Sequence, residues 1–196
     1  NLGLDVRHYQ PIYRNIIFAS RLAYAHSGGN QQVNYVMGGV DNWLFARQSA
    51  MPPPTSQNFA FQALAHNLRG YPQNARRGNS FGVINAELRA PVLASILKRP
   101  IQSAFLKNLQ VVGFVDAGSA WNGWAPNSSD DDYTFSTGGI PNITISLPSP
   151  DYGLAVGYGA GLRTMLFGYF IRVDAAWNIG QQTAKPMWIF SLGTDF

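Results

Sequence analysis

The feature that most limits how this chain can fold is an alternation of apolar and polar residues that persists over segments of about ten residues. A period of two residues indicates a β-strand, because successive side chains point to opposite faces of a sheet. In the segment 169–178, one face carries Tyr169, Ile171, Val173, Ala175 and Trp177, and the other carries Phe170, Arg172, Asp174, Ala176 and Asn178. The same pattern predicts strands at 81–91 and at the C-terminus, where Trp188, Phe190, Leu192 and Phe196 share a face.

Four further strands are predicted at about 2–9, 14–26, 109–121 and 153–166, which brings the total to seven. Most are about ten residues long, whereas strands of soluble proteins usually have about five or six. About ten tilted residues is the length that crosses a lipid bilayer. The fold class is therefore all-β, with strands long enough to span a membrane.

The two faces of these strands differ in chemistry. The polar faces carry charges of both signs, which are costly in an apolar core but suit a water-filled lumen. They are Asp5, Arg7, Arg21, Glu87, Arg89, Asp116, Arg163, Arg172 and Asp174. The opposite faces are aliphatic and aromatic, and lipid cannot satisfy the free edges of an open sheet. The sequence therefore predicts a transmembrane antiparallel β-barrel, or part of one.

Composition removes several other classes of protein. The 196 residues include no cysteine, which excludes disulfides and thiol chemistry. No run of about 18 apolar residues is present, so no transmembrane helix is expected. The net charge of +4 comes from scattered basic residues, which does not favour a nucleic-acid partner. The chain begins at Asn1 without a methionine, which indicates a processed product or a fragment.

The connections between the predicted strands alternate in length. Long ones at 28–79 and 122–152 are separated by short ones at 10–13 and 166–168 and by a connection of intermediate length at 92–108, where a short amphipathic helix is expected. Outer-membrane barrels have short turns on the periplasmic side and long loops outside. Both long connections are therefore predicted to be extracellular.

Two short motifs stand in these positions. Leu68-Arg69-Gly70-Tyr71 lies near the end of the first long loop, and Phe114, Asp116 and Gly118 share one face of the strand at 109–121. Together they resemble the bacterial surface antigen or outer-membrane assembly-factor superfamily of BamA/TamA-type barrels, to which two-partner secretion transporters are related. In that superfamily the loop folds into the lumen, and its arginine meets acids on the next two strands. The resemblance assigns those roles to Arg69, Glu87 and Asp116.

The resemblance covers nearly the whole chain and implies the last seven strands of a sixteen-stranded barrel in the bacterial outer membrane. It implies a protein that inserts client β-barrels through a lateral seam at its C-terminal strand, without enzymatic chemistry or cofactors. The expected partners are the bilayer, unfolded outer-membrane clients, and accessory periplasmic or lipoprotein subunits. Trp188, Phe190, Leu192, Gly193 and Phe196 would form the seam and a C-terminal signal for membrane insertion.

Two alternatives stay open. The first is a secretion pore of the two-partner type within the same superfamily. The second is a small structural or adhesive outer-membrane barrel, in which the segment ITISL at 143–147 supplies an eighth strand. A loop of about 50 residues with a matched Arg-Gly-Tyr tip has no use in that second design.

Other candidate motifs favour ordinary structural roles. Gly157, Gly159 and Gly161 resemble a dinucleotide-binding loop only superficially, because the alternation continues through them, and we expect them to leave room for the inserted loop. Asp130, Asp131 and Asp132 lack the spacing of a calcium loop. His8, His26 and His66 are far apart in sequence and accompany no nucleophile motif, so no metal or hydrolase site is predicted.

Overall fold

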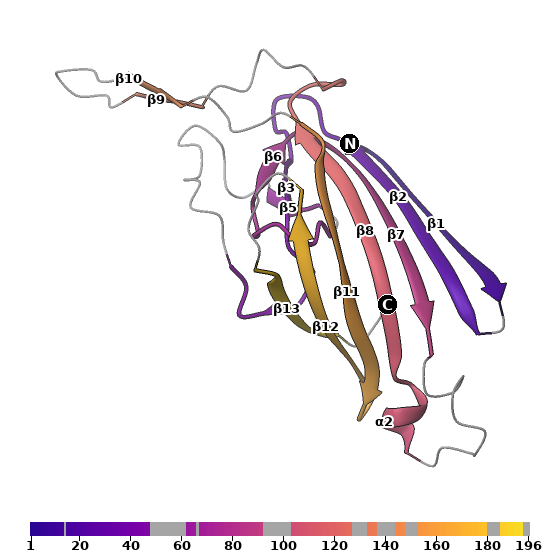
Figure 1. The fold of residues 1–196 in the computed structure, drawn as a ribbon. Helices are drawn as coiled ribbons and strands as arrows, with labels where there is room; N and C mark the ends of the chain where they lie inside the picture. Colours follow the sequence, from indigo (N-terminus) through magenta and orange to yellow (C-terminus); the bar gives the residue numbers. More distant parts are fainter. Residues whose placement is uncertain are drawn as a thin grey trace.

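The computed structural model describes residues 1–13, 15–47, 62–65, 67–91, 103–126, 133–136, 144–147, 153–179 and 185–193. Its main element is a curved antiparallel sheet of eight strands in the order β1-β2-β7-β8-β11-β12-β13-β4 (Figure 1). The long strands are β1 (Leu2–Tyr13), β2 (Ile16–His26), β7 (Ser80–Ala90), β8 (Gln110–Trp121), β11 (Ala155–Leu166), β12 (Tyr169–Asn178) and β13 (Met187–Gly193). The eighth strand, β4 (Trp43–Leu44), comes from the connection between β2 and β7.

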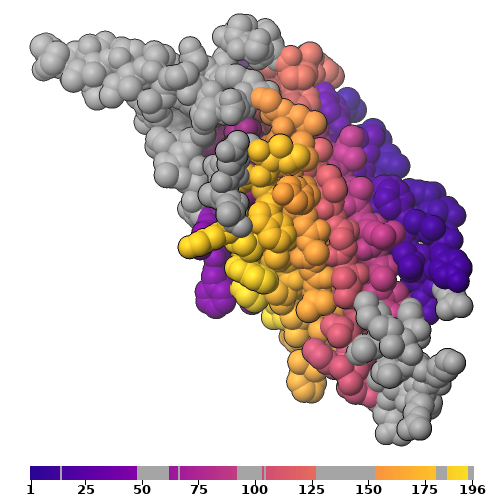
Figure 2. All heavy atoms as spheres, viewed as in Figure 1, coloured from indigo at the N-terminus to yellow at the C-terminus, as the bar shows by residue number. Residues whose placement is uncertain are grey.

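The all-β prediction is confirmed, and the described part of the sheet does not close into a barrel. Six of the seven long strands have ten to twelve residues. They lie side by side in chain order, as the successive colour bands of Figure 2 show. Within the described residues, the outer edge of β1 has no partner strand.

The two faces of the sheet follow the predicted alternation. One face exposes apolar side chains on every long strand, including Leu4, Leu22, Ile84, Val115, Leu162, Tyr169 and Phe190. The opposite face, here called the inner face, carries the charged residues and packs against the β2–β7 connection. Val83, Val112 and Ile189 are almost completely buried on it. Hydrophobicity therefore points outward, as expected for a sheet that meets lipid.

One prediction about the connections is wrong. Residues 10–13 are not a turn, because β1 continues through them and pairs with β2 up to the match of Tyr13 with Ile16. A register shift between Pro11 and Tyr13 accommodates the proline, which is tolerated at a bulge on an edge strand. The alternative of an eighth strand in the main sheet is not met in the described part of that segment, because β10 (Thr144–Leu147) pairs with β9 (Tyr133–Ser136) in a separate two-stranded sheet.

The β2–β7 connection forms a small sheet of its own, in the order β5-β3-β6. Its strands are β3 (Asn34–Met37), β5 (Gln62–Leu64) and β6 (Arg76–Gly78). Met37, Leu68 and Tyr71 from this connection join Phe81 and Val83 of β7 in one buried apolar cluster. This packing holds the connection against the inner face.

The connection between β7 and β8 contains a short helix, α2 (Ala104–Lys107). It contacts β11 through a hydrogen bond from the Thr164 hydroxyl to the Phe105 carbonyl, at 2.8 Å. Residues 92–102, most of the predicted amphipathic segment, lie outside the described residues. None of the described helices has the length and hydropathy of a membrane span.

Candidate functional site

The segment Leu68–Tyr71 forms a tight turn that is clamped to Gly39 by two backbone hydrogen bonds. The Leu68 amide donates to the Gly39 carbonyl and the Gly39 amide donates to the Tyr71 carbonyl, both at 3.0 Å. Gly70 has a φ of 89°, a left-handed conformation that a residue with a side chain rarely adopts. The turn directs the Arg69 side chain at the inner face of the sheet.

The guanidinium of Arg69 donates two parallel hydrogen bonds to the carboxylate of Asp116 on β8. Its Nε lies 2.6 Å from Oδ2 and its Nη2 lies 2.7 Å from Oδ1. The backbone amide of Arg69 also donates to Oδ2, at 3.1 Å. Arg69 is 2% exposed and Asp116 is fully buried. Bidentate, charge-assisted bonds of this kind are the strongest that side chains make.

Three further groups surround the same guanidinium. Nη1 lies 2.8 Å from Glu87 Oε1 on β7 and 3.8 Å from Asp174 Oδ2 on β12. The Arg69 Cζ stands 3.6 Å above the centre of the Phe114 ring, which is cation–π distance. One arginine of the loop therefore contacts side chains of three strands of the sheet.

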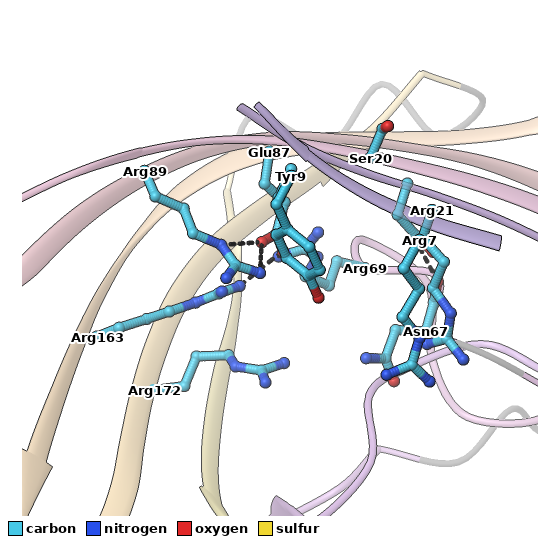
Figure 3. A pocket seen from close by; sticks show the side chains of 12 residues that line it. Arg7, Tyr9, Ser20, Arg21, Asn67, Arg69, Glu87, Arg89, Arg163 and Arg172 are labelled. Carbon is cyan, nitrogen blue, oxygen red and sulfur yellow. Dashed lines mark hydrogen bonds and ion pairs between the residues drawn. The ribbon is translucent and has the colours of Figure 1, made fainter. Parts of the chain in front are cut away.

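The carboxylates of this site have other partners. The Asn85 amide donates to Asp116 Oδ1 at 2.8 Å and to the Asn67 carbonyl at 2.9 Å. Glu87 also accepts hydrogen bonds from Arg163, at 2.6 Å, and from Arg89, at 2.8 and 2.9 Å. Figure 3 shows Arg69, Arg89 and Arg163 converging on the Glu87 carboxylate. We call Arg69, Glu87, Asp116 and Asp174 the Arg69 cluster.

Gly157 of β11 leaves room for this segment, and Gly159 and Gly161 leave room for atoms of the neighbouring strands. A Cβ at Gly157 would collide with the Arg69 carbonyl, and one at Gly159 would meet the Phe114 ring. A Cβ at Gly161 would collide with the Asp174 carboxylate. All three face inward in the register with β8 and β12. Gly118, by contrast, faces the Gly82 carbonyl of β7 and does not meet the loop.

The residues beside Arg69 attach the turn to β11 and β12. The Tyr71 hydroxyl lies 3.2 Å from the Val156 amide and 3.4 Å from the Val156 carbonyl. The Asn178 side chain donates to the Gly70 carbonyl at 2.8 Å. Leu68 is completely buried in the apolar cluster of the loop.

The electrostatics of the site keep Arg69 charged. Burial alone would lower the pKa of its guanidinium, but the hydrogen bonds to Asp116 and the surrounding carboxylates raise that pKa above its usual value. A permanently charged group does not exchange protons. The four side chains thus form an ion-paired network around a cation that keeps its charge. Among the described residues, no group of histidines and acids has the arrangement of a metal site.

The C-terminal strand is the second candidate region. Trp188, Phe190 and Leu192 of β13 are exposed on the outer face, whereas Ile189 and Ser191 face inward. Only two pairs join β13 to β4, between Phe190 and Leu44 and between Ser191 and Trp43. Gly193 ends β13, and Phe196, like Asp130, Asp131, Asp132 and His66, lies outside the described residues.

Sequence reasoning did not assign Asp174, Asn85 and Arg163 to this site. The alternation in the sequence places all three on polar faces, but it does not show which of them lie near Arg69. Their positions depend on strand register: Asn85 lies opposite Asp116, and Asp174 lies opposite Gly161. The two described histidines do not come together, since His26 bonds to Ser80 at 2.7 Å and stacks on Trp124, while His8 is exposed on β1.

Comparison with known families agrees with this architecture. The model of the Omp85 superfamily domain matches residues 1–196. No curated protein matches the sequence. The chain belongs to the Omp85 superfamily, a family of outer-membrane proteins that insert or secrete other proteins.

Proposed function

We propose that this chain is the C-terminal part of an outer-membrane barrel that inserts client β-barrels through a seam at β13. The observation that carries the proposal is the state of the β13 edge. Among the described residues, that edge forms two register pairs with β4, at Phe190 and Ser191, and one further hydrogen bond from the Leu192 amide to the Asn42 carbonyl at 3.4 Å, although β13 runs from Met187 to Gly193. An edge with free backbone groups is a template to which an incoming strand can add.

The Arg69 cluster has a supporting role in this proposal. It is a latch: the ion pairs and the apolar cluster around Leu68 fix the loop against β7, β8, β11 and β12. The wall then stays rigid while the edge of β13 exchanges partners. The long loops at 28–79 and 122–152 lie outside the cell in this arrangement, and the polar inner face lines the lumen.

The test is insertion of several unrelated barrel clients by the complete protein in liposomes. Wild type is compared with Arg69→Ala, Asp116→Ala and the control Arg47→Ala, which removes an exposed arginine of the same loop. Clients are scored as protease-protected, heat-modifiable bands. We expect wild type and the control to insert them and both cluster variants to fail.

A different result separates this function from its alternative. If the wild type inserts no client but exports one soluble partner, or only conducts ions, the protein is a secretion pore of the same superfamily. If Arg47→Ala inserts clients as poorly as Arg69→Ala does, the loop is needed for insertion, but the ion pairs of the Arg69 cluster are not the reason.

A further inference from the structure

A cavity lies between the β2–β7 connection and the inner face, beside the end of β13. Its volume is about 340 Å³, many times that of a water molecule. It is lined by four arginines (Arg7, Arg21, Arg163 and Arg172) and one acid, Asp41. The same four arginines also line a smaller cavity nearer Glu87, shown in Figure 3.

The positive charge is not evenly compensated. Asp5 forms ion pairs with Arg7 at 3.0 Å and with Arg21 at 2.6 Å. Glu87 forms ion pairs with Arg69, Arg89 and Arg163, and Arg69 is also paired with Asp116 and lies 3.8 Å from Asp174. No described residue forms an ion pair or a hydrogen bond with Arg172, although Asp174, two residues along β12 on the same face, attracts it. Figure 3 draws the Arg172 guanidinium among the side chains that line the smaller cavity.

Arg163 and Arg172 stand directly opposite each other in the register of β11 and β12. Like charges in directly opposed positions repel and destabilise a sheet. Arg163 is 6% exposed, and its Nε has no hydrogen-bond partner. An oxyanion between the two guanidiniums would supply acceptors for Arg172 and for Arg163 Nε, and it would remove the repulsion. Planar guanidiniums are well suited to such an anion, because they present paired donors to two oxygens.

We propose that Arg163 and Arg172 form a binding site for an oxyanion, a phosphate or carboxylate group, held between the loop and the end of β13. Asn67 and Ser191 line the same cavity and offer further polar contacts. The group has two possible sources: a soluble phosphate or a carboxylate of the protein itself. An occupant at this position links the loop to β13, next to the residues that pair with β4.

The site is tested in the complete protein by thermal unfolding in phosphate and in chloride at equal ionic strength. Wild type is compared with Arg172→Gln, with Arg172→Lys and with the control Arg47→Gln. A soluble oxyanion predicts a higher melting temperature in phosphate for wild type and not for Arg172→Gln. Titration calorimetry with inorganic phosphate should then show binding that is at least about tenfold weaker in Arg172→Gln.

A carboxylate of the protein predicts a different pattern. Phosphate then has no effect, but Arg172→Gln melts at a lower temperature than wild type, Arg172→Lys melts between the two, and the control is unchanged. If no anion occupies the site, Arg172→Gln should instead raise the melting temperature, because the substitution removes a positive charge that repels Arg163. If phosphate has no effect and Arg172→Gln melts at the same temperature as wild type or higher, the proposal is overturned.

Discussion

The β2–β7 connection meets the sheet in two places, and the two contacts differ in kind. At Arg69, three hydrogen bonds and an ion pair join the loop to side chains on β7 and β8, and both Arg69 and Asp116 are almost completely buried. At β4, two residues pair with the backbone of β13: the pair of Leu44 and Phe190 is 46% and 42% exposed, whereas Trp43 and Ser191 are buried. Contacts that are few and partly exposed to solvent open at lower free energy than buried networks, which open only with the whole fold. We therefore expect the loop to have a fixed attachment at Arg69 and an exchangeable one at β4.

The largest effect is expected from Arg69→Ala. The substitution leaves Asp116 fully buried without its cation, and breaking a buried pair in this way costs about 3–5 kcal/mol. The measurement is the free energy of unfolding in denaturant, made on the complete protein in detergent micelles or liposomes. Arg47→Ala should leave it unchanged.

The double variant Arg69→Met/Asp116→Leu sharpens this prediction. Replacement of both charges by apolar residues of similar volume is often close to neutral. If the double variant is as unstable as Arg69→Ala alone, the cost comes from lost packing in the loop and not from an unpaired carboxylate.

The second effect is expected from Gly157→Ala. The new methyl group would collide with the Arg69 carbonyl, so the turn must move away from β11, at a cost of about 1–3 kcal/mol. The matched control is Gly113→Ala on the neighbouring strand, where a Cβ meets nothing within 4 Å.

Loop release provides a second measurement for the same pair of variants. Because the chain has no cysteine, the substitution Gln73→Cys, at a half-buried position just after the turn, reports exposure of the turn to a thiol reagent. Labelling should be faster in the Gly157→Ala background than in Gly113→Ala. Equal rates in both backgrounds would show that the turn tolerates the methyl group where it is.

Much of the fixed attachment can be predicted from the sequence, because it depends on period and motif. Alternation alone puts Asp116 and Glu87 on the charged faces of their strands, and the Arg-Gly-Tyr motif marks the turn. Asp174 escapes assignment because its approach to Arg69 depends on the register of β11 with β12, which has no local signal. The error at Pro11 has the same origin: a proline usually signals a turn, and only the bulge on an edge strand keeps it within β1.

The exchangeable attachment could not be predicted. A two-residue strand has no measurable period, and its partner on β13 is far away in sequence. Asn42 and Phe45, on either side of β4, have φ values of 55° and 63°, which side chains other than glycine seldom adopt. Asparagine adopts that conformation more often than most residues, but phenylalanine does not indicate it, so β4 becomes apparent only from the packing of Trp43 against Ile189 and Ala176.

A third, smaller effect is expected from Tyr71→Phe at the edge of the fixed attachment. The variant keeps the buried ring and loses the hydroxyl that contacts the Val156 amide and carbonyl. A typical hydrogen bond contributes about 0.5–1.5 kcal/mol, and we expect a loss in that range by denaturant unfolding. The matched control is Tyr158→Phe on the outer face of β11, the strand that contains Val156, and it should leave the free energy of unfolding unchanged. A loss below the error of the measurement would mean that water replaces the hydroxyl at Val156.

The smallest effect on global stability is expected from Leu44→Ala in the exchangeable attachment. A cross-strand pair of this kind contributes about 0.2–1 kcal/mol, and Leu44 is half exposed. The effect on local opening should be larger than the effect on global stability, because we expect the pairing of β4 with β13 to open without the rest of the sheet. Hydrogen exchange should therefore accelerate at the amides of residues 190–192 and stay unchanged at residues 114–118 of β8, beneath Arg69.

A disulfide between β4 and β13 would hold this contact closed, and it tests whether client insertion requires the contact to open. Leu44 and Phe190 are register partners, and directly opposed positions of antiparallel strands are close enough for a disulfide. In the double variant Leu44→Cys/Phe190→Cys, oxidation should slow exchange at residues 190–192 and, under the proposed function, reduce client insertion, with recovery after a reductant is added. The single variants control for loss of the side chains. If the oxidised protein inserts clients as fast as the reduced one, β4 does not have to leave β13, and the client must approach another part of that edge.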